Sequence, residues 1–159
     1  MSRHLALHRL PMIITVIIGL VLTIVPLPEW FEIGRPDFLV LIVLYWSTMN
    51  PRVGGLTLAF LVGLMLDAFT GVVLGQHALA LCLVAAIAIK LHLRMRVFPI
   101  LHQAMTIFWL LVLYEFVLFW TDGGTGHAVT TWMRWIPALV GAVLWPIVAG
   151  LLGRAYQRT

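Results

Sequence analysis

Residues 55–79 read GLTLAFLVGLMLDAFTGVVLGQHAL, an almost wholly apolar stretch that contains a single carboxylate, Asp67. Small residues precede this acid at intervals of four positions: Gly55, Ala59 and Gly63. Positions four apart lie along one ridge of a helix, and in lipid a ridge of small residues lets a neighbouring backbone approach closely. The stretch therefore predicts a packed membrane helix, a turn around Gly75, Gln76 and His77, and the start of the next helix.

The composition of the whole chain agrees with a membrane location. Of its 159 residues, 62% are hydrophobic and only 10% are charged, whereas soluble domains carry about 25% charged residues. A soluble domain of this size lacks the interior volume to hide so much apolar surface. The single cysteine, Cys82, cannot form an internal disulfide and is interpreted as a small packing residue. The net charge of +4 is attributed to the cytoplasmic edge of a membrane protein and not to nucleic-acid binding.

The apolar runs predict a single polytopic membrane domain, an all-α compact bundle of about six transmembrane helices. They are expected at residues 10–27, 36–49, 55–69, 77–90, 99–120 and 132–153. The second run covers only about 21 Å, less than the ~30 Å hydrocarbon core, so neighbouring helices must shelter it or the bilayer must thin there. The sequence KLHLRMRVF at residues 90–98 is expected to be a basic connector, and residues 121–131 an outer loop.

The basic residues predict the orientation. Six crossings place both termini on one side, and eight of the ten Lys and Arg residues then fall on that side: Arg3, Arg9, Arg52, Lys90, Arg94, Arg96, Arg154 and Arg158. Only Arg35 and Arg134 fall on the other side. Because cytoplasmic loops are enriched in Lys and Arg, we expect both termini in the cytoplasm. Four tryptophans are expected in an aromatic belt at the outer edge: Trp30, Trp120, Trp132 and Trp135.

Three polar residues near the outer edge are candidate functional groups. Asp67 is expected either to contact a partner helix, a ligand or a proton, or to join two helices by bonding His77, Gln76 or the amides of the turn. Glu115 is expected to reach the interface, to pair with His77 or Arg134, or to line a cavity. Asp67 and His77 are too few ligands for a metal site, and no zinc-binding spacing is present.

Two further patterns suggest contacts. The pairs Ala138–Ala142 and Ala149–Gly153 have the spacing of small residues that pack against another helix, in this chain, in an oligomer or in a partner. Lys90, Arg94 and Arg96 are expected to set the orientation or to contact a cytoplasmic protein or anionic lipid. No motif for a serine hydrolase or a phosphate-binding loop is present. The aspartates also lack the polar motifs of the lipoprotein signal peptidases, so we expect no enzyme activity and no cofactor.

Two segments, RPDFLVLIVLYWSTMNPRVGG and GLMLDAFTGVVLGQHALAL, resemble hallmark stretches of the rod shape-determining MreD family in its proteobacterial form, and the arrangement around LHLRMRVFPILHQA is similar. This resemblance implies an inner-membrane component of the complex that guides lateral cell-wall synthesis. The implied partners are the transmembrane helix of MreC, the actin-like MreB, and RodA with its penicillin-binding transpeptidase. The resemblance also implies a fold like that of the S components of energy-coupling-factor transporters. It transfers no catalytic residue.

We therefore expect a non-enzymatic scaffold that binds MreC and helps maintain rod shape, with a homo-oligomer possible. Its candidate partner-contact or helix-packing residues are Gly55, Ala59, Gly63, Asp67, Gly75, Gln76, His77 and Glu115. The alternative is a small-molecule-binding subunit of a transporter. That alternative requires an outward-open cavity with several convergent polar groups near Asp67, His77 and Glu115.

Overall fold

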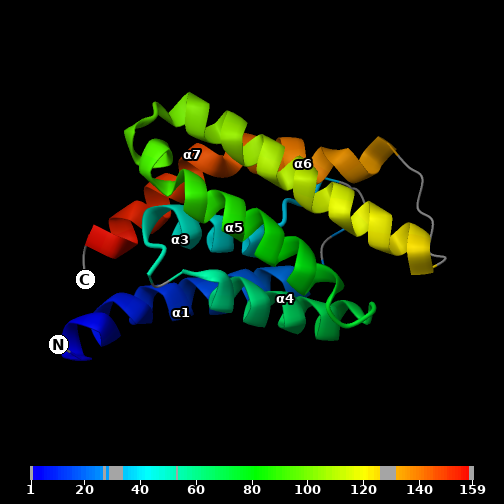
Figure 1. The fold of residues 1–159 in the computed structure, drawn as a ribbon, viewed down its shortest axis with the longest axis horizontal. Coiled ribbons are helices and arrows are strands. Elements are labelled where there is room, and N and C mark those ends of the chain that lie inside the picture. The colour runs from blue at the N-terminus through cyan, green and yellow to red at the C-terminus, as the bar shows by residue number, and fades with distance from the viewer. Residues whose placement is uncertain (1, 27, 29–33, 53, 126–131, 158–159) are drawn as a thin grey trace.

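The computed structural model describes residues 2–26, 28, 34–52, 54–125 and 132–157. These residues form an all-α bundle of six α-helices and one short 3₁₀ helix (Figure 1): α1 (Ser2–Ile24), α3 (Phe38–Met49), α4 (Leu56–Thr70), α5 (Gln76–Val97), α6 (Ile100–Thr125), η1 (Trp132–Trp135) and α7 (Ile136–Gln157). Within the described residues, three segments are long and apolar enough to cross a membrane: Gln76–Val97, Ile100–Gly124 and Trp132–Arg154. Three shorter apolar helices accompany them. The predicted fold class, a compact membrane bundle, is confirmed.

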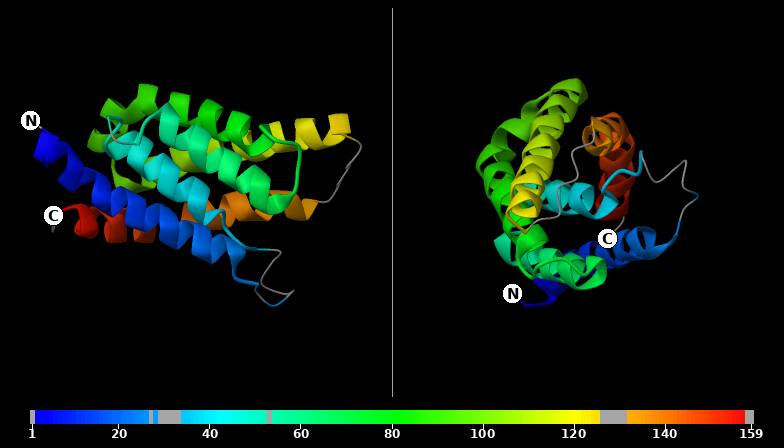
Figure 2. Two further views of the ribbon diagram at one scale, coloured as in Figure 1. Left: turned by 90° about the horizontal axis from the view of Figure 1, so that it is seen from below. Right: turned by 90° about the vertical axis from the view of Figure 1, so that its right-hand side faces the viewer.

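Helix α3 forms the centre of the bundle, and the other helices surround it (Figure 2). All residues from Leu39 to Thr48 are buried. The helix packs against α5, α1, α7 and, more lightly, α4. This position explains how a helix of 12 residues can be so apolar and so short: its neighbours shelter it, which was the first of the two expected solutions.

The α4–α5 hairpin brings two backbones into close contact. A Cβ added at Gly63 would lie 2.2 Å from the Cα of Ala78, so only glycine allows this approach. Ala59 lies on the same face of α4 and is fully buried. The ridge of small residues therefore packs against α5 within the chain.

The helices α6 and α7 form a second antiparallel pair, and α1 covers α3 from another side (Figure 1). The Nε1–H of Trp46 in α3 donates a buried hydrogen bond to the Thr15 hydroxyl in α1 at 3.0 Å. A bulky side chain at Gly141 of α7 would meet Leu111 of α6, since an added Cβ would lie 2.7 Å from its Cδ1.

The two ends of the bundle differ in charge. The start of α1, the turn after α5 and the end of α7 lie at one end (Figure 2). This end, here called the basic end, carries Arg52, Lys90, Arg94, Arg96 and Arg154. The opposite end, here called the acidic end, carries Asp37, Asp67, Glu115 and Asp122.

Several predicted helix boundaries are wrong. Helix α5 continues to Val97 and does not stop at residue 90, because Lys, Leu, Arg and Met all favour a helix. The expected connector is thus its last two turns. Helix α6 continues to Thr125, past the predicted end at residue 120. The first helix spans Ser2–Ile24 instead of residues 10–27. The expected sixth helix is divided into η1 and α7, and α7 extends beyond residue 153 to Gln157.

The structure describes three of the four tryptophans expected in the aromatic belt: Trp120, Trp132 and Trp135. Trp120 and Trp132 are 73% and 91% exposed, as a position at a membrane surface requires. Trp30, also expected in the belt, and Arg158 lie outside the described residues, as does most of the expected loop at residues 121–131.

Candidate functional site

Asp67 lies in the last turn of α4, and its side chain is completely buried. Its Oδ2 accepts the N–H of Gly75 at 2.8 Å, and its Oδ1 accepts the N–H of His77 at 2.7 Å. A longer bond of 3.4 Å comes from the N–H of Ala78. The first amides of a helix have no partner within the helix. The carboxylate of α4 therefore caps the N-terminus of α5, where the helix dipole favours negative charge.

The imidazole of His77 adds a side-chain contact to this cap. Its Nδ1 lies 2.9 Å from Oδ1 of Asp67, and the ring centroid lies 6.3 Å from that of Tyr114 in α6. His77 therefore links the α4–α5 hairpin to α6.

Two glycines shape the turn that brings these amides to Asp67. Gly71 ends α4 with φ of +68°, and Gly75 precedes α5 with φ of +104°. Side chains other than glycine rarely adopt these left-handed conformations. The spacing of four from Asp67 to Gly71 and Gly75 thus reflects backbone conformation, and the spacing from Gly55 to Gly63 reflects packing.

Arg134 of η1 forms the second polar group of the acidic end. Its Nε lies 3.3 Å from Oε2 of Glu115, and its Nη1 lies 2.7 Å from Oδ2 of Asp122. Asp122 also accepts a hydrogen bond from the side-chain amide of Gln76. One guanidinium thus joins two carboxylates of α6 to the start of the last membrane segment, and Gln76 ties α5 to the same group.

Asp37 completes the acidic end. It precedes α3, and its carboxyl group lies close to that of Glu115 in α6. The central helix is in this way joined to α6.

The structure brings most of the sequence-predicted residues together. Asp67, Gly75, Gln76, His77 and Glu115 all lie at the acidic end. Asp67 bonds to His77 and to amides of the turn, which was one of the two expectations for it. Glu115 pairs with Arg134, one of the two partners expected for it. Gly55 is apart from them, because it begins α4 at the basic end. Lys90, Arg94 and Arg96 are exposed on α5.

Sequence reasoning missed the contributions of Asp37 and Asp122. One signal was available: Arg134 is a lone cation in an apolar segment at the predicted outer edge, so it requires nearby acids. The carboxylates of the preceding helix were the candidates.

The described polar groups of the acidic end are engaged in bonds that join helices. The carboxylate of Asp67 is occupied by amides and an imidazole, and those of Glu115 and Asp122 by Arg134. Among the described residues, no group of three His, Cys, Asp or Glu side chains is placed to hold a metal ion. None of the three cavities described for this structure is lined by Asp67, His77 or Glu115.

The sequence of the chain is similar to one family of known proteins. The sequence model of one family, rod shape-determining protein MreD, matches residues 4–155. The chain is 30% identical over 142 residues to the rod shape-determining protein MreD of Haemophilus influenzae, covering 89% of this chain and 87% of that protein. No solved structure matches, so the expected likeness to transporter S components stays a prediction.

Proposed function

The chain belongs to the MreD family of rod shape-determining proteins, and from this premise we propose that it is a non-enzymatic inner-membrane scaffold of the cell-elongation complex. It binds the transmembrane helix of MreC and helps to guide lateral peptidoglycan synthesis. MreB, and RodA with its transpeptidase, are the further partners of this proposal.

The observation that carries the proposal is the use of the embedded polar groups. In a transporter or an enzyme of the membrane, such groups face a cavity or a substrate path. Here Asp67 of α4 bonds to the start of α5, and Arg134 of η1 bonds to Glu115 and Asp122 of α6, so these groups join helices to each other at the acidic end. A rigid bundle with an apolar exterior suits a scaffold that recognises other membrane helices.

The face proposed for the MreC helix is the outer side of α4. The small-residue ridge is excluded, because α5 already covers Ala59 and Gly63. Away from this ridge, α4 exposes five large apolar side chains: Leu56, Phe60, Leu61, Met65 and Phe69.

The length of α4 supports this choice. Its 15 residues span about 22 Å, roughly 8 Å less than the hydrocarbon core. Unlike α3, it lies at the periphery and packs mainly on α5. Each ångström of mismatch with the lipid costs a fraction of a kcal/mol. A partner helix against its outer face removes this cost, whereas α6 and α7 are long enough to match the bilayer.

The basic end is the proposed cytoplasmic side, with both chain termini there. Its cations support this orientation by the positive-inside rule. Lys90 and Arg94 lie four residues apart on one face of α5, and Arg96 is exposed in the same last turns, so we propose these three cations as the contact for a cytoplasmic partner. Replacing all three by Gln should lower recovery of that partner while topology is kept. Unchanged recovery and unchanged cell shape would remove the patch from the proposal.

The central experiment is depletion of the protein in its rod-shaped host, followed by rescue from a plasmid. Rods should become spheres and recover, and MreC should co-purify with the plasmid copy. Cells that stay rod-shaped but lose uptake of a nutrient would instead establish the transporter alternative.

A photo-crosslinking side chain then tests the docking face. Placed at Phe60 or Phe69 of α4, it should capture MreC. The control is Val143 of α7, which is 74% exposed, more than Phe60 and Phe69, and belongs to a helix that packs mainly on α6 and α3. Capture from Val143 alone would show that the proposed face is wrong while leaving the scaffold function intact.

A further inference from the structure

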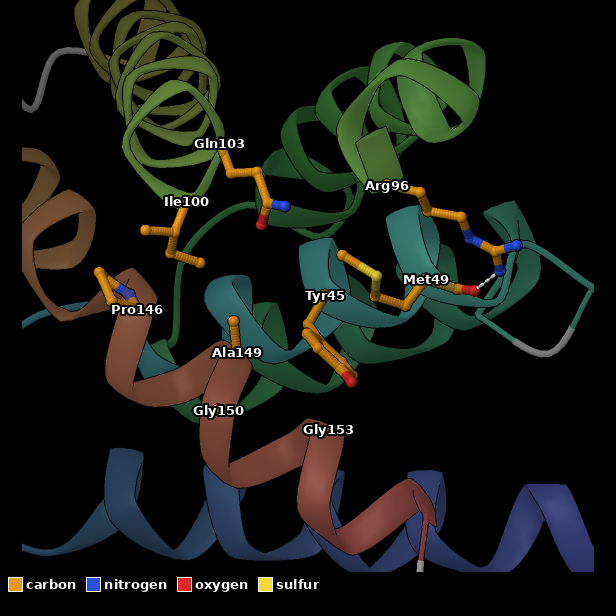
Figure 3. Close-up of a pocket in the computed structure, with 9 residues that line it drawn as sticks. All are labelled: Tyr45, Met49, Arg96, Ile100, Gln103, Pro146, Ala149, Gly150 and Gly153. Atoms are coloured by element: carbon orange, nitrogen blue, oxygen red, sulfur yellow. Dashed lines mark hydrogen bonds between the residues drawn. The ribbon is translucent and has the colours of Figure 1, made fainter. Parts of the chain in front are cut away.

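A cavity of about 690 Å³ opens at the basic end, between the end of α3, the start of α6 and the last turns of α7. Its polar lining consists of Tyr45, Arg96 and Gln103 (Figure 3). Arg96 extends from α5 over the end of α3, where its guanidinium donates to the carbonyl of Met49. The wall formed by α7 carries small residues, and at Gly150 an added Cβ would meet no atom within 4 Å. The cavity therefore combines a cation with free space.

A second cavity, of about 600 Å³, lies between α6 and α7 and extends along these helices away from the basic end. All of its lining residues are apolar, among them Ala104, Phe108, Leu139 and Ala142. Pro146 lines both cavities, so the two adjoin. From Pro146 to Leu139 the groove rises about 10 Å along α7 at 1.5 Å per residue.

The charged cavity and the apolar groove beside it match the head group and an acyl chain of an anionic phospholipid. A guanidinium presents five N–H donors, and the bond to Met49 leaves others for a phosphate. Basic pockets between membrane helices bind anionic head groups in this way. The apolar groove starts beside the charged pocket and leads into the membrane, as an acyl chain does. Arg94 and Arg154 are exposed at the same end and add positive potential.

We propose that one anionic phospholipid of the leaflet at the basic end binds here, with its phosphate on Arg96 and one acyl chain between α6 and α7. The site is separate from the acidic end and from the outer face of α4. It goes beyond the scaffold function, and it shares only Arg96 with the basic patch proposed for a cytoplasmic partner.

Arg96 lines the cavity and Arg94 does not, so the two arginines give a matched test. The detergent-purified full chain is titrated with dioleoylphosphatidylglycerol or dioleoylphosphatidylcholine, and bound lipid is counted by native mass spectrometry. One phosphatidylglycerol should bind in preference to phosphatidylcholine. Arg96→Gln should weaken this binding about tenfold, the effect of one charge-assisted bond. Arg94→Gln removes the same charge from the same helix. Because Arg94 lines no part of the cavity, this substitution should change the affinity less than twofold.

A second variant tests the groove without touching the cation. Ala142→Phe fills the apolar cavity and should also reduce phosphatidylglycerol binding, with Arg96 and its bond to Met49 intact. Circular dichroism establishes that each variant is folded.

Three results would overturn the proposal. They are equal binding of the two lipids, equal losses from Arg96→Gln and Arg94→Gln, and unchanged binding in Ala142→Phe. Capture of MreC or a second copy of this chain by a crosslinker at Ala142 in cells would assign the groove to a protein helix and would overturn it as well. Because these titrations use the purified chain, their failure is distinct from a failure to restore rod shape.

Discussion

Replacement of Asp67 by Leu should destabilise the fold strongly. The substitution removes the fully buried acceptor of two short, partly buried amide bonds, from Gly75 and His77. An unsatisfied buried donor costs about 1–3 kcal/mol in soluble proteins, whereas side-chain bonds in membrane proteins average about 0.6 kcal/mol and reach about 1.7 kcal/mol. With about 1–2 kcal/mol for each of the two amides, Asp67→Leu should lower the free energy of unfolding by about 2–4 kcal/mol.

Two further variants divide this loss. Asp67→Asn keeps one acceptor oxygen and should cost about half as much. His77→Ala removes only the imidazole contact and leaves the amides paired, so it should cost about 0.5–1 kcal/mol. Unfolding is followed by tryptophan fluorescence as the mole fraction of sodium dodecyl sulfate rises in mixed micelles.

The order of the three variants is the test. An unfolding midpoint of Asp67→Leu equal to that of the unsubstituted chain would show that the cap contributes nothing. A loss in His77→Ala as large as in Asp67→Leu would assign the stability to the imidazole contact and not to the amides. MreC recovery should fall with stability in this series, and wild-type levels of MreC in Asp67→Leu would remove Asp67 from the assembly argument.

Three other outcomes follow from the packing, the ion pairs and the orientation. Gly63→Ala should cost about 1–3 kcal/mol because its Cβ meets the α5 backbone, whereas Gly150→Ala, with open space around it, should be neutral in the same unfolding assay. Arg134→Ala should cost about 2 kcal/mol, less than the 3–5 kcal/mol of a fully buried pair, and adding Glu115→Gln should restore part of the loss; additive losses would contradict the pairing. Trp132→Cys, in a chain without the native cysteine, should react with a membrane-impermeant maleimide in intact spheroplasts, and labelling only after lysis would reverse the proposed orientation.

Much of the fold was predictable from local sequence. The apolar runs place all six helices, because nothing but a helix satisfies its own backbone within lipid. The intervals of four around Asp67 predicted a close helix contact without naming the neighbour, and at Gly63 that neighbour is α5. The helix ends were harder to predict, since segments such as residues 121–125, TDGGT, contain poor helix formers.

The missing information was tertiary. Asp122 lies in that extra turn of α6, and it bonds Gln76, 46 residues away in sequence, and Arg134 of η1. These bonds hold the turn in a helix against its composition. The same reasoning applies to Glu115: the sequence offered His77 and Arg134 as partners, and only the packing of α6 against η1 selects Arg134.

Small residues illustrate why one pattern can have two outcomes. Gly63 of α4 belongs to a row of small residues spaced for helix packing, and Gly150 of α7 lies beside another such pair, Ala149–Gly153. At Gly63 the backbone of α5 fills the space, so the row is used within the chain. At Gly150 the space is empty and joins a cavity beside Arg96. Between helices in lipid, attraction depends on van der Waals contact, so an unfilled row on a membrane helix is a surface on which something else gains that contact. The chain satisfies its acidic end internally and leaves the α6–α7 side of its basic end open, which places the search for a bound molecule there and not at the buried carboxylates.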